Sequence, residues 1–97
     1  MGAGGLAYTA RNPLILNTTL TNANQWYLVA SAVKGVRKWM IKTNEGTANA
    51  FDLAFVSSPS TVFSNSGVGL SLDNCDLPDV YCRSTTAGTI IEILYFG

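Results

Sequence analysis

The chain has 97 residues, of which 47% are hydrophobic and only 12% are charged, and it contains no histidine. This length fits one small domain, and the composition is that of a folded chain rather than a disordered tail. The formal net charge is zero, which excludes the basic footprint of a nucleic-acid-binding protein. The apolar stretches fall far short of the ~20 residues that span a bilayer, and residues 1–8 do not read as a signal peptide. We therefore expect neither a nucleic-acid partner nor a membrane partner.

The charges balance overall but are segregated along the chain. Residues 1–44 carry basic residues and no acid, whereas residues 45–97 carry all six acidic residues and a single base, Arg83. A compact fold that interleaves the two halves is the simpler interpretation. The alternative is that a basic surface of one copy meets an acidic surface of its neighbour, which would set the orientation of an assembly.

The first third of the chain contains one clear strand and one ambiguous segment. Residues 1–13 form a Gly-rich arm that ends in an Asn-Pro dipeptide, a turn or extended signal. Residues 14–20 predict a strand with its leucines on one side and Ile15 on the other. Residues 25–33 also fit helical spacing, with Asn24 as a possible cap. We favour a strand there because Trp, Tyr and Val cluster in that segment.

The middle of the chain has the cleanest alternation. Residues 36–43 place Trp39 and Ile41 on one face and Met40, between two lysines, on the other. A turn signal follows, and residues 49–56 predict a second strand. Its inward side chains are expected to be Phe51, Leu53 and Phe55. Together the two segments predict a β-hairpin with an aromatic inner face.

The remaining segments are short and separated by turns rich in Ser, Asn and Gly. We expect further strands near residues 61–63, 68–72, 80–84 and 89–96. Six to eight short strands with frequent turns are typical of an all-β protein, specifically a small antiparallel, jelly-roll-like β-sandwich. The predicted organisation is an extended N-terminal arm, residues 1–13, followed by a single sandwich domain, residues 14–97.

The last predicted strand is apolar on both faces. Ile90, Leu94 and Phe96 load one face, with Glu92 as its only polar member, while the other face is also apolar. A strand of a small antiparallel sheet normally buries one face and exposes the other. Either this strand is central or a second polypeptide covers its outer side; placement of Ile90 and Phe96 at frayed ends or under a loop is the alternative.

An oligomer or docking interface follows as a hypothesis from that pattern. A small domain gains stability by burying further apolar area at a contact with another chain, and an arm that reaches a neighbouring subunit would become ordered there. The predicted interface residues are Leu6, Tyr8, Ile90, Leu94 and Phe96.

Chemistry-bearing residues are few, and we expect no catalytic, cofactor-binding or metal-binding residue. Without histidine the commonest general base is missing, together with the usual activator of Ser and Cys nucleophiles. Asp73, Asp76 and Asp79 do not match a calcium-binding loop; a solvated acidic turn is favoured over an irregular calcium site. Cys75 and Cys82 lack zinc-site spacing, and small buried thiols in a reducing cytosol are favoured over a local disulfide.

The aromatic residues allow a second interpretation, a stacking platform for sugars. The candidates are Trp26, Tyr27, Trp39, Tyr81 and Tyr95. The alternation around Trp39 favours the core for that residue, and Trp26 is also assigned to the core, less strongly.

From residue 28 to the end, the order of features is similar to that of small all-β virion proteins of tailed bacteriophages. The similarity lies in Val36-Arg37-Lys38-Trp39-Met40-Ile41, Asn44-x-Gly46, Phe51-x-Leu53-x-Phe55, Gly67-x-Gly69, Leu77-Pro78-x-x-Tyr81-x-Arg83-Ser84 and Ala87-Gly88-Thr89-x-x-Glu92-Ile93. Such proteins decorate or cement heads, or serve as accessory pieces of fibres and tails.

This resemblance implies a non-enzymatic structural protein with no active site. It implies a homo-oligomer, with a trimer favoured, that docks on the major capsid protein or another virion protein. The location implied is the virion, assembled in the host cytoplasm. A glycan- or receptor-binding module of a phage fibre or tail is the alternative.

Overall fold

The computed structural model describes residues 13–47 and 49–96, and within this part the fold is all-β. The strands are β1 (Leu14–Leu20), β2 (Tyr27–Ala30), β3 (Lys38–Thr43), β4 (Phe51–Ala54), β5 (Phe63–Asn65), β6 (Leu70–Asp73), β7 (Val80–Arg83) and β8 (Thr89–Phe96), and a short 3-10 helix, η1 (Glu45–Thr47), follows β3. The predicted β-sandwich is confirmed, and the ambiguous segment around β2 is a strand.

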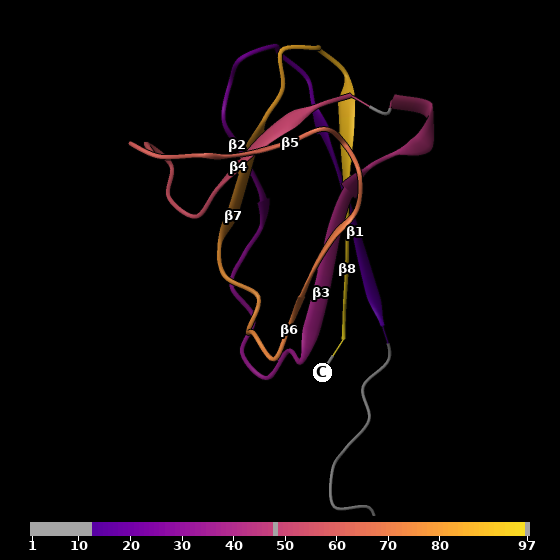
Figure 1. Cartoon of the computed structure of the whole chain (residues 1–97), viewed down its shortest axis with the longest axis vertical. Coiled ribbons are helices and arrows are strands. Elements are labelled where there is room, and N and C mark those ends of the chain that lie inside the picture. Colours follow the sequence, from indigo (N-terminus) through magenta and orange to yellow (C-terminus); the bar gives the residue numbers. More distant parts are fainter. Residues whose placement is uncertain (1–12, 48, 97) are drawn as a thin grey trace, which may run out of the picture.

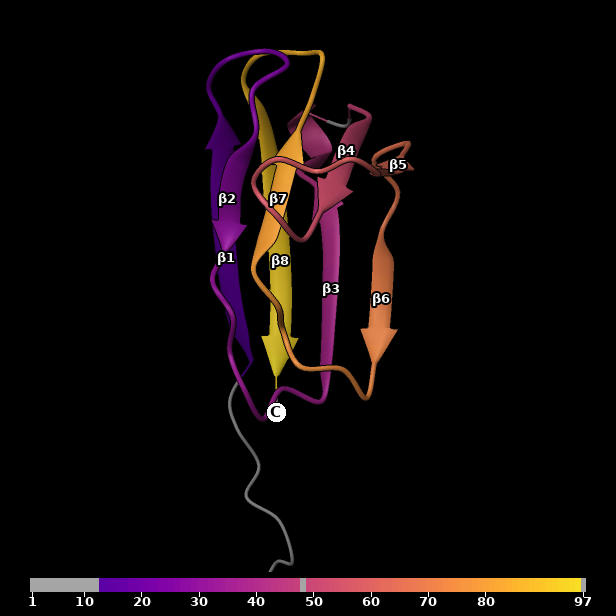
Figure 2. The same cartoon turned by 90° about the vertical axis from the view of Figure 1, so that its left-hand side faces the viewer.

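Two four-stranded sheets pack face to face. Sheet I has the strand order β1-β8-β3-β6, and sheet II has the order β2-β7-β4-β5. Figure 1 shows the two layers beside each other, and Figure 2 shows β1 and β2 along one side of the sandwich and β5 and β6 along the other. Every strand pair is antiparallel.

The topology is that of a jelly roll. The ladders β1·β8, β2·β7, β3·β6 and β4·β5 are what results when one long antiparallel ribbon is wrapped around a core. Sheet I therefore combines the first and last strands of the described chain, and β8 lies at its centre between β1 and β3.

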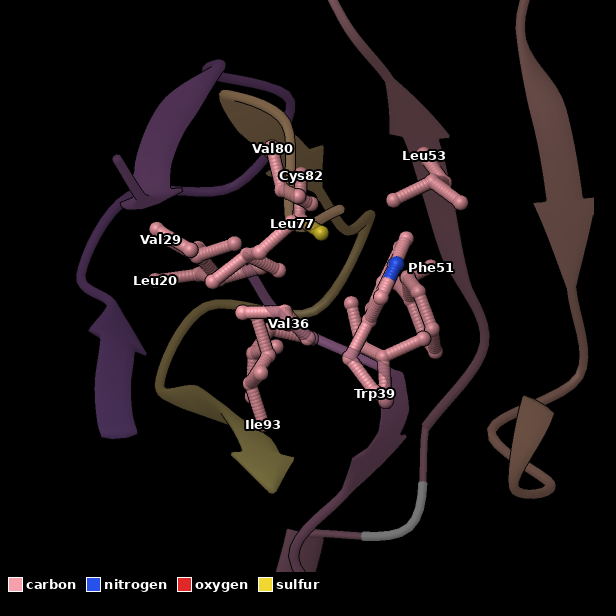
Figure 3. Packing of buried hydrophobic residues seen from close by; sticks show 13 residues of the cluster. Leu20, Val29, Val36, Trp39, Phe51, Leu53, Leu77, Val80, Cys82 and Ile93 are labelled. Carbon is pink, nitrogen blue, oxygen red and sulfur yellow. The ribbon is translucent and has the colours of Figure 1, made fainter. Parts of the chain in front are cut away.

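The core lies between the sheets, where alternate residues of each strand point inward. In β3 the side chains of Trp39, Ile41 and Thr43 are buried and their neighbours are half-buried. The buried apolar side chains form one cluster, drawn in part in Figure 3, comprising Leu20, Val29, Ala30, Val36, Trp39, Ile41, Phe51, Leu53, Leu77, Val80, Cys82, Ile91 and Ile93. Burying large apolar side chains stabilises each by about 1.5–3 kcal/mol relative to exposure, so this cluster holds the sheets together.

The predicted hairpin of residues 36–43 and 49–56 is wrong. The segment that begins with η1 carries the chain from one layer to the other, so β3 pairs with β8 and β6 in sheet I while β4 pairs with β7 and β5 in sheet II. Phe55, expected to point inward, is 50% exposed because β4 ends at Ala54.

Candidate interaction surface

The outer face of sheet I is built from the alternation of its central strand. In β8 the residues Thr89, Ile91 and Ile93 are buried, while the intervening Ile90 and Leu94 are half-buried and point away from the core. The backbone alternation of a strand requires this division, because successive side chains project to opposite faces. The structure thus places Ile90 and Leu94, together with Phe96, on one face.

Neighbouring strands extend this face into an apolar row. Ile15 of β1 and Met40 of β3 flank Leu94 of β8, and Ser71 of β6 lies opposite Met40. Ile15 is 69% exposed. We call the row formed by Ile15, Leu94 and Met40 the apolar row of sheet I.

A hollow lies along this row. It has a volume of about 470 Å³ and is lined by Ile15, Met40, Ile41, Lys42, Gly69, Leu70, Ser71, Glu92, Ile93 and Leu94. Most of the lining is apolar. On the side of β6 it includes Gly69, which has no side chain, and Ser71, whose side chain is small, so the hollow has room for a protruding group of another molecule.

Charged pairs border the apolar row. Two residues from Met40 along β3 and from Leu94 along β8, Lys42 Nζ lies 2.8 Å from Glu92 Oε1. Asn44 Nδ2 donates to Glu92 Oε2 at 2.7 Å. These contacts hold the pKa of Glu92 below its ordinary value of 4.5, chiefly through the hydrogen bond from Lys42 and then that from Asn44. On the opposite side of the row, Lys38 Nζ lies 3.7 Å from Asp73 Oδ1.

Each of these pairs joins the basic half of the sequence to its acidic half. Lys38 and Lys42 come from the first 44 residues, and Asp73 and Glu92 come from the remainder. The fold interleaves the two halves here, which agrees with the simpler interpretation of the charge segregation.

The outer face of sheet II carries a polar and aromatic row. Arg83 Nε donates to Asp52 Oδ2 at 2.9 Å, and Ser64 Oγ donates to Asp52 Oδ1 at 2.9 Å. The Arg83 guanidinium carbon lies 4.6 Å from the centroid of the Trp26 ring. Trp26 is partly exposed and does not belong to the core cluster, so its assignment to the core is wrong. The aromatic platform is reduced here to one cation–π pair, Trp26 with Arg83, beside the carboxylate of Asp52 that Arg83 binds.

Three of the other aromatic candidates, Trp39, Tyr27 and Tyr95, belong to the core or pack against it. Trp39 is fully buried, which confirms its assignment to the core. Tyr27 and Tyr95 pack against the core cluster. Tyr81 is half-buried on β7.

The acidic turn and the cysteines have structural roles. Asp79 Oδ1 accepts a hydrogen bond from the Ala32 N–H, and Asp76 Oδ1 accepts one from the Gly35 N–H. Both cysteines are free. Cys82 is buried, and burial, reinforced by the charge of Asp52, raises its thiol pKa to about 12.

Cys75 is only partly buried, which departs from the expected pair of buried thiols. Within residues 13–47 and 49–96, His, Cys, Asp and Glu side chains form no group of three or more that could hold a metal ion. The same residues include no helix long and apolar enough to cross a membrane.

The structure brings together part of the predicted interface. Ile90, Leu94 and Phe96 share the outer face of sheet I, whereas Leu6 and Tyr8 lie outside the described residues. Sequence reasoning missed Ile15 and Met40 as members of this surface. The alternation of residues 14–20 and 36–43 predicts that both side chains point away from the core, but only the strand register places them beside Leu94.

Comparison of the chain with protein families, with curated proteins and with solved structures found no match.

Proposed function

We propose that this protein is a non-enzymatic structural component of a bacteriophage virion, a capsid decoration or cement protein that associates with copies of itself and docks on the virion shell. The partner in docking is the major capsid protein or another virion protein, and the oligomer favoured by the resemblance is a trimer. The protein acts within the virion, which is assembled in the host cytoplasm.

The observation that carries the proposal is the apolar row of sheet I. The outward residues of the central strand β8 are Ile90, Glu92, Leu94 and Phe96, and the three apolar ones are only half-buried in the single chain. Ile15 adds a side chain that is 69% exposed. Apolar side chains that share an outer face and stay partly exposed support a contact with another protein, and their burial at ~25 cal/mol per Å² would stabilise a small domain.

The sequence supports the non-enzymatic part of the proposal. The full chain contains no histidine, and histidine is the commonest general acid and base. The carboxylates of Asp52, Asp76 and Asp79 are bound to groups of the protein itself. These contacts give the carboxylates a structural role in the loops and in sheet II.

Docking is tested with particles of the virus that encodes the protein. We expect mass spectrometry of purified particles to find it in many copies, and immunogold labelling to place it on the shell. Leu94→Lys should prevent incorporation, because it introduces a charge into the apolar row. Thr85→Lys, a control on the exposed β7–β8 turn, should be incorporated normally. Particles that lack the protein, or that incorporate both variants equally, would contradict the proposal.

A glycan- or receptor-binding module of a phage fibre or tail is the second candidate, and the pair of Trp26 and Arg83 on sheet II favours it. A partly exposed indole beside a guanidinium and a carboxylate can stack on a sugar ring and hydrogen-bond its hydroxyl groups. Saturable binding on a glycan array that Trp26→Ala abolishes would favour this function. The structural proposal expects no saturable sugar binding.

A further inference from the structure

Two strands of each sheet have one edge that pairs with no other described strand: β1 and β6 in sheet I, and β2 and β5 in sheet II. Such an edge exposes backbone N–H and C=O groups to which another chain can pair, and proteins usually protect it with short strands, charges or irregular register. The four edges of this sandwich differ sharply in that protection.

Three of the edges carry such devices. β5 has only three residues. β2 has four residues and a register shift between Leu28 and Ala30. β6 also has four residues and ends in the charged Asp73. β1 has none of these, because its seven residues carry no charge and keep an unbroken register with β8.

The hydrogen-bond pattern identifies the groups on the open edge of β1. Asn44 N donates to Ile90 O at 2.8 Å, which continues the ladder between β3 and β8. The backbone groups of Ile90 and of every second residue after it therefore point to β3, and those of the residues between them point to β1. Opposite them in register, the even-numbered residues of β1 bond to β8. The N–H and C=O groups of Ile15, Asn17 and Thr19 consequently face the open edge.

This arrangement is complementary to itself. Two antiparallel copies of β1, related by a two-fold axis at Asn17, place Ile15 opposite the partner's Thr19 and Asn17 opposite the partner's Asn17. These are the residues whose backbone groups face outward, so each pair exchanges both of its hydrogen bonds. Shifting one copy by two residues gives the next register that places outward-facing residues opposite each other, and it would lose one of these pairs. The strand carries no charge, so no like charges meet across the axis.

The side chains fit the same pairing. Leu14 and Ile15 are 52% and 69% exposed, and the partner's Leu20 and Thr19 would lie opposite them. Figure 2 shows that β1 and β2 lie on the same side of the sandwich. A cleft of about 340 Å³ lies between the sheets there, lined by Leu16, Leu28, Val29, Ala30, Ser31, Val33 and Tyr95. A second copy would bring further apolar surface to its mouth.

We propose that β1 of one copy pairs with β1 of a second copy across this two-fold axis, which joins two sheets I into one eight-stranded sheet. The inference rests on the self-association in the proposed function and adds its partner strand and register. A two-fold contact gives an even number of chains. The assembly is a dimer if this contact acts alone; combined with the three-fold contact of the trimer in the proposed function, it joins two trimers into a hexamer.

Amide hydrogen exchange followed by NMR tests the pairing residue by residue. The amides of Ile15, Asn17 and Thr19 should be protected at high protein concentration and should lose that protection on dilution. The amides of Leu16 and Thr18 bond to β8 and should stay protected at both concentrations, which makes them internal controls. Protection of Asn17 in a sample diluted until light scattering gives the mass of a single chain would overturn the inference, because another part of the same chain would then cover β1.

Variants at position 17 test it by mass. Asn17→Pro removes an N–H group that faces the open edge and should halve the molar mass measured by light scattering. Thr85→Lys, on the exposed β7–β8 turn, is the control for an added charge away from β1, so its mass should not change. Asn17→Lys, which places two like charges on the axis, gives the same test if Asn17→Pro does not fold.

Leu94→Lys separates this inference from the proposed function. If the wild type associates and both Asn17 variants keep its full mass while Leu94→Lys lowers it, the β1 pairing is wrong and the outer-face contact stands. If the wild type is a monomer at every concentration, both the pairing and the proposed self-association are wrong.

Discussion

Two glycines with positive φ have very different surroundings, so their substitutions separate steric conflict from backbone strain. Gly67 has φ +99°, and a Cβ there would lie 2.8 Å from Asn49 O and 2.9 Å from Thr43 Oγ1. Gly88 has φ +83° and open space around it.

We expect Gly67→Ala to lower the free energy of unfolding clearly more than Gly88→Ala, which should cost about 1–2 kcal/mol from strain alone. Gly69 has neither positive φ nor a close neighbour, so Gly69→Ala is the control, with an effect of about 0.5 kcal/mol or less. Urea denaturation measures the series. Equal losses at positions 67 and 88 would contradict the steric argument.

Trp39 is fully buried, yet its indole Nε1 has no hydrogen-bond partner among the described residues. A buried donor without an acceptor costs about 1–3 kcal/mol, while the ring itself fills the centre of the core. We expect Trp39→Ala to destabilise the fold by about 3–5 kcal/mol. Trp39→Phe should cost much less, since it keeps an aromatic ring and removes the unpaired donor. Thermal and urea unfolding of the two variants would check this order, and a reversed order would refute it.

At the scale of the strands, the contact between Glu92 of β8 and Lys42 of β3 predicts a pH dependence. The folded protein favours the ionised carboxylate, because the pKa of Glu92 lies below its ordinary value of 4.5. The contribution to stability is therefore fully present above that ordinary value and is lost as the pH falls through the lower, folded-state pKa.

Unfolding of the wild type and of Glu92→Gln between pH 7 and pH 2 measures this effect. The wild type should be the more stable at neutral pH, and the difference should shrink as the pH falls below about 4.5. Glu45→Gln removes a carboxylate elsewhere on the surface and controls for net charge. A difference that stays constant over the whole range would contradict the prediction.

The sequence predicted the strands far better than their pairing. The alternation around Trp39 and the apolar run of residues 89–96 are local signals, and both became strands with the expected inner faces. The hairpin prediction failed because the partner of a strand depends on contacts between distant segments, which no local pattern encodes. Phe55 was misplaced for a related reason, since the alternation continues past the point where β4 leaves the sheet.

The candidate surface was predicted in the same partial way. The outward direction of Ile90, Leu94 and Phe96 follows from the period of a strand, and so it could be obtained from the sequence. That Ile15 and Met40 lie on either side of Leu94 depends on the register of β1 and β3 with β8. The open edge of β1 likewise became visible only once the sheet order was known.

The whole molecule is dominated by pairings between distant parts of the chain. β1 pairs with β8, β2 with β7, and β3 with both β6 and β8. Proteins rich in such contacts close long loops before they gain stabilising contacts, and they fold in milliseconds to seconds.

We expect this protein to fold within that range in stopped-flow experiments that follow tryptophan fluorescence, with the burial of Trp39 as the signal. Dilution to low micromolar concentration should leave the main phase unchanged, because it reports folding within one chain. Folding within microseconds would contradict the expectation.

The place of β8 in sheet I has a consequence for synthesis on the ribosome. Residues 14–20 leave the ribosome long before residues 89–96 have been made, and β3 also depends on β8 for one of its two ladders. Until that late segment emerges, the uncharged β1 lacks β8, its one neighbour in sheet I, in a crowded cell where other nascent chains are close. Sheet I can therefore assemble only near the end of translation of this domain. We expect incomplete chains that still lack β8 to be the most dependent on chaperones.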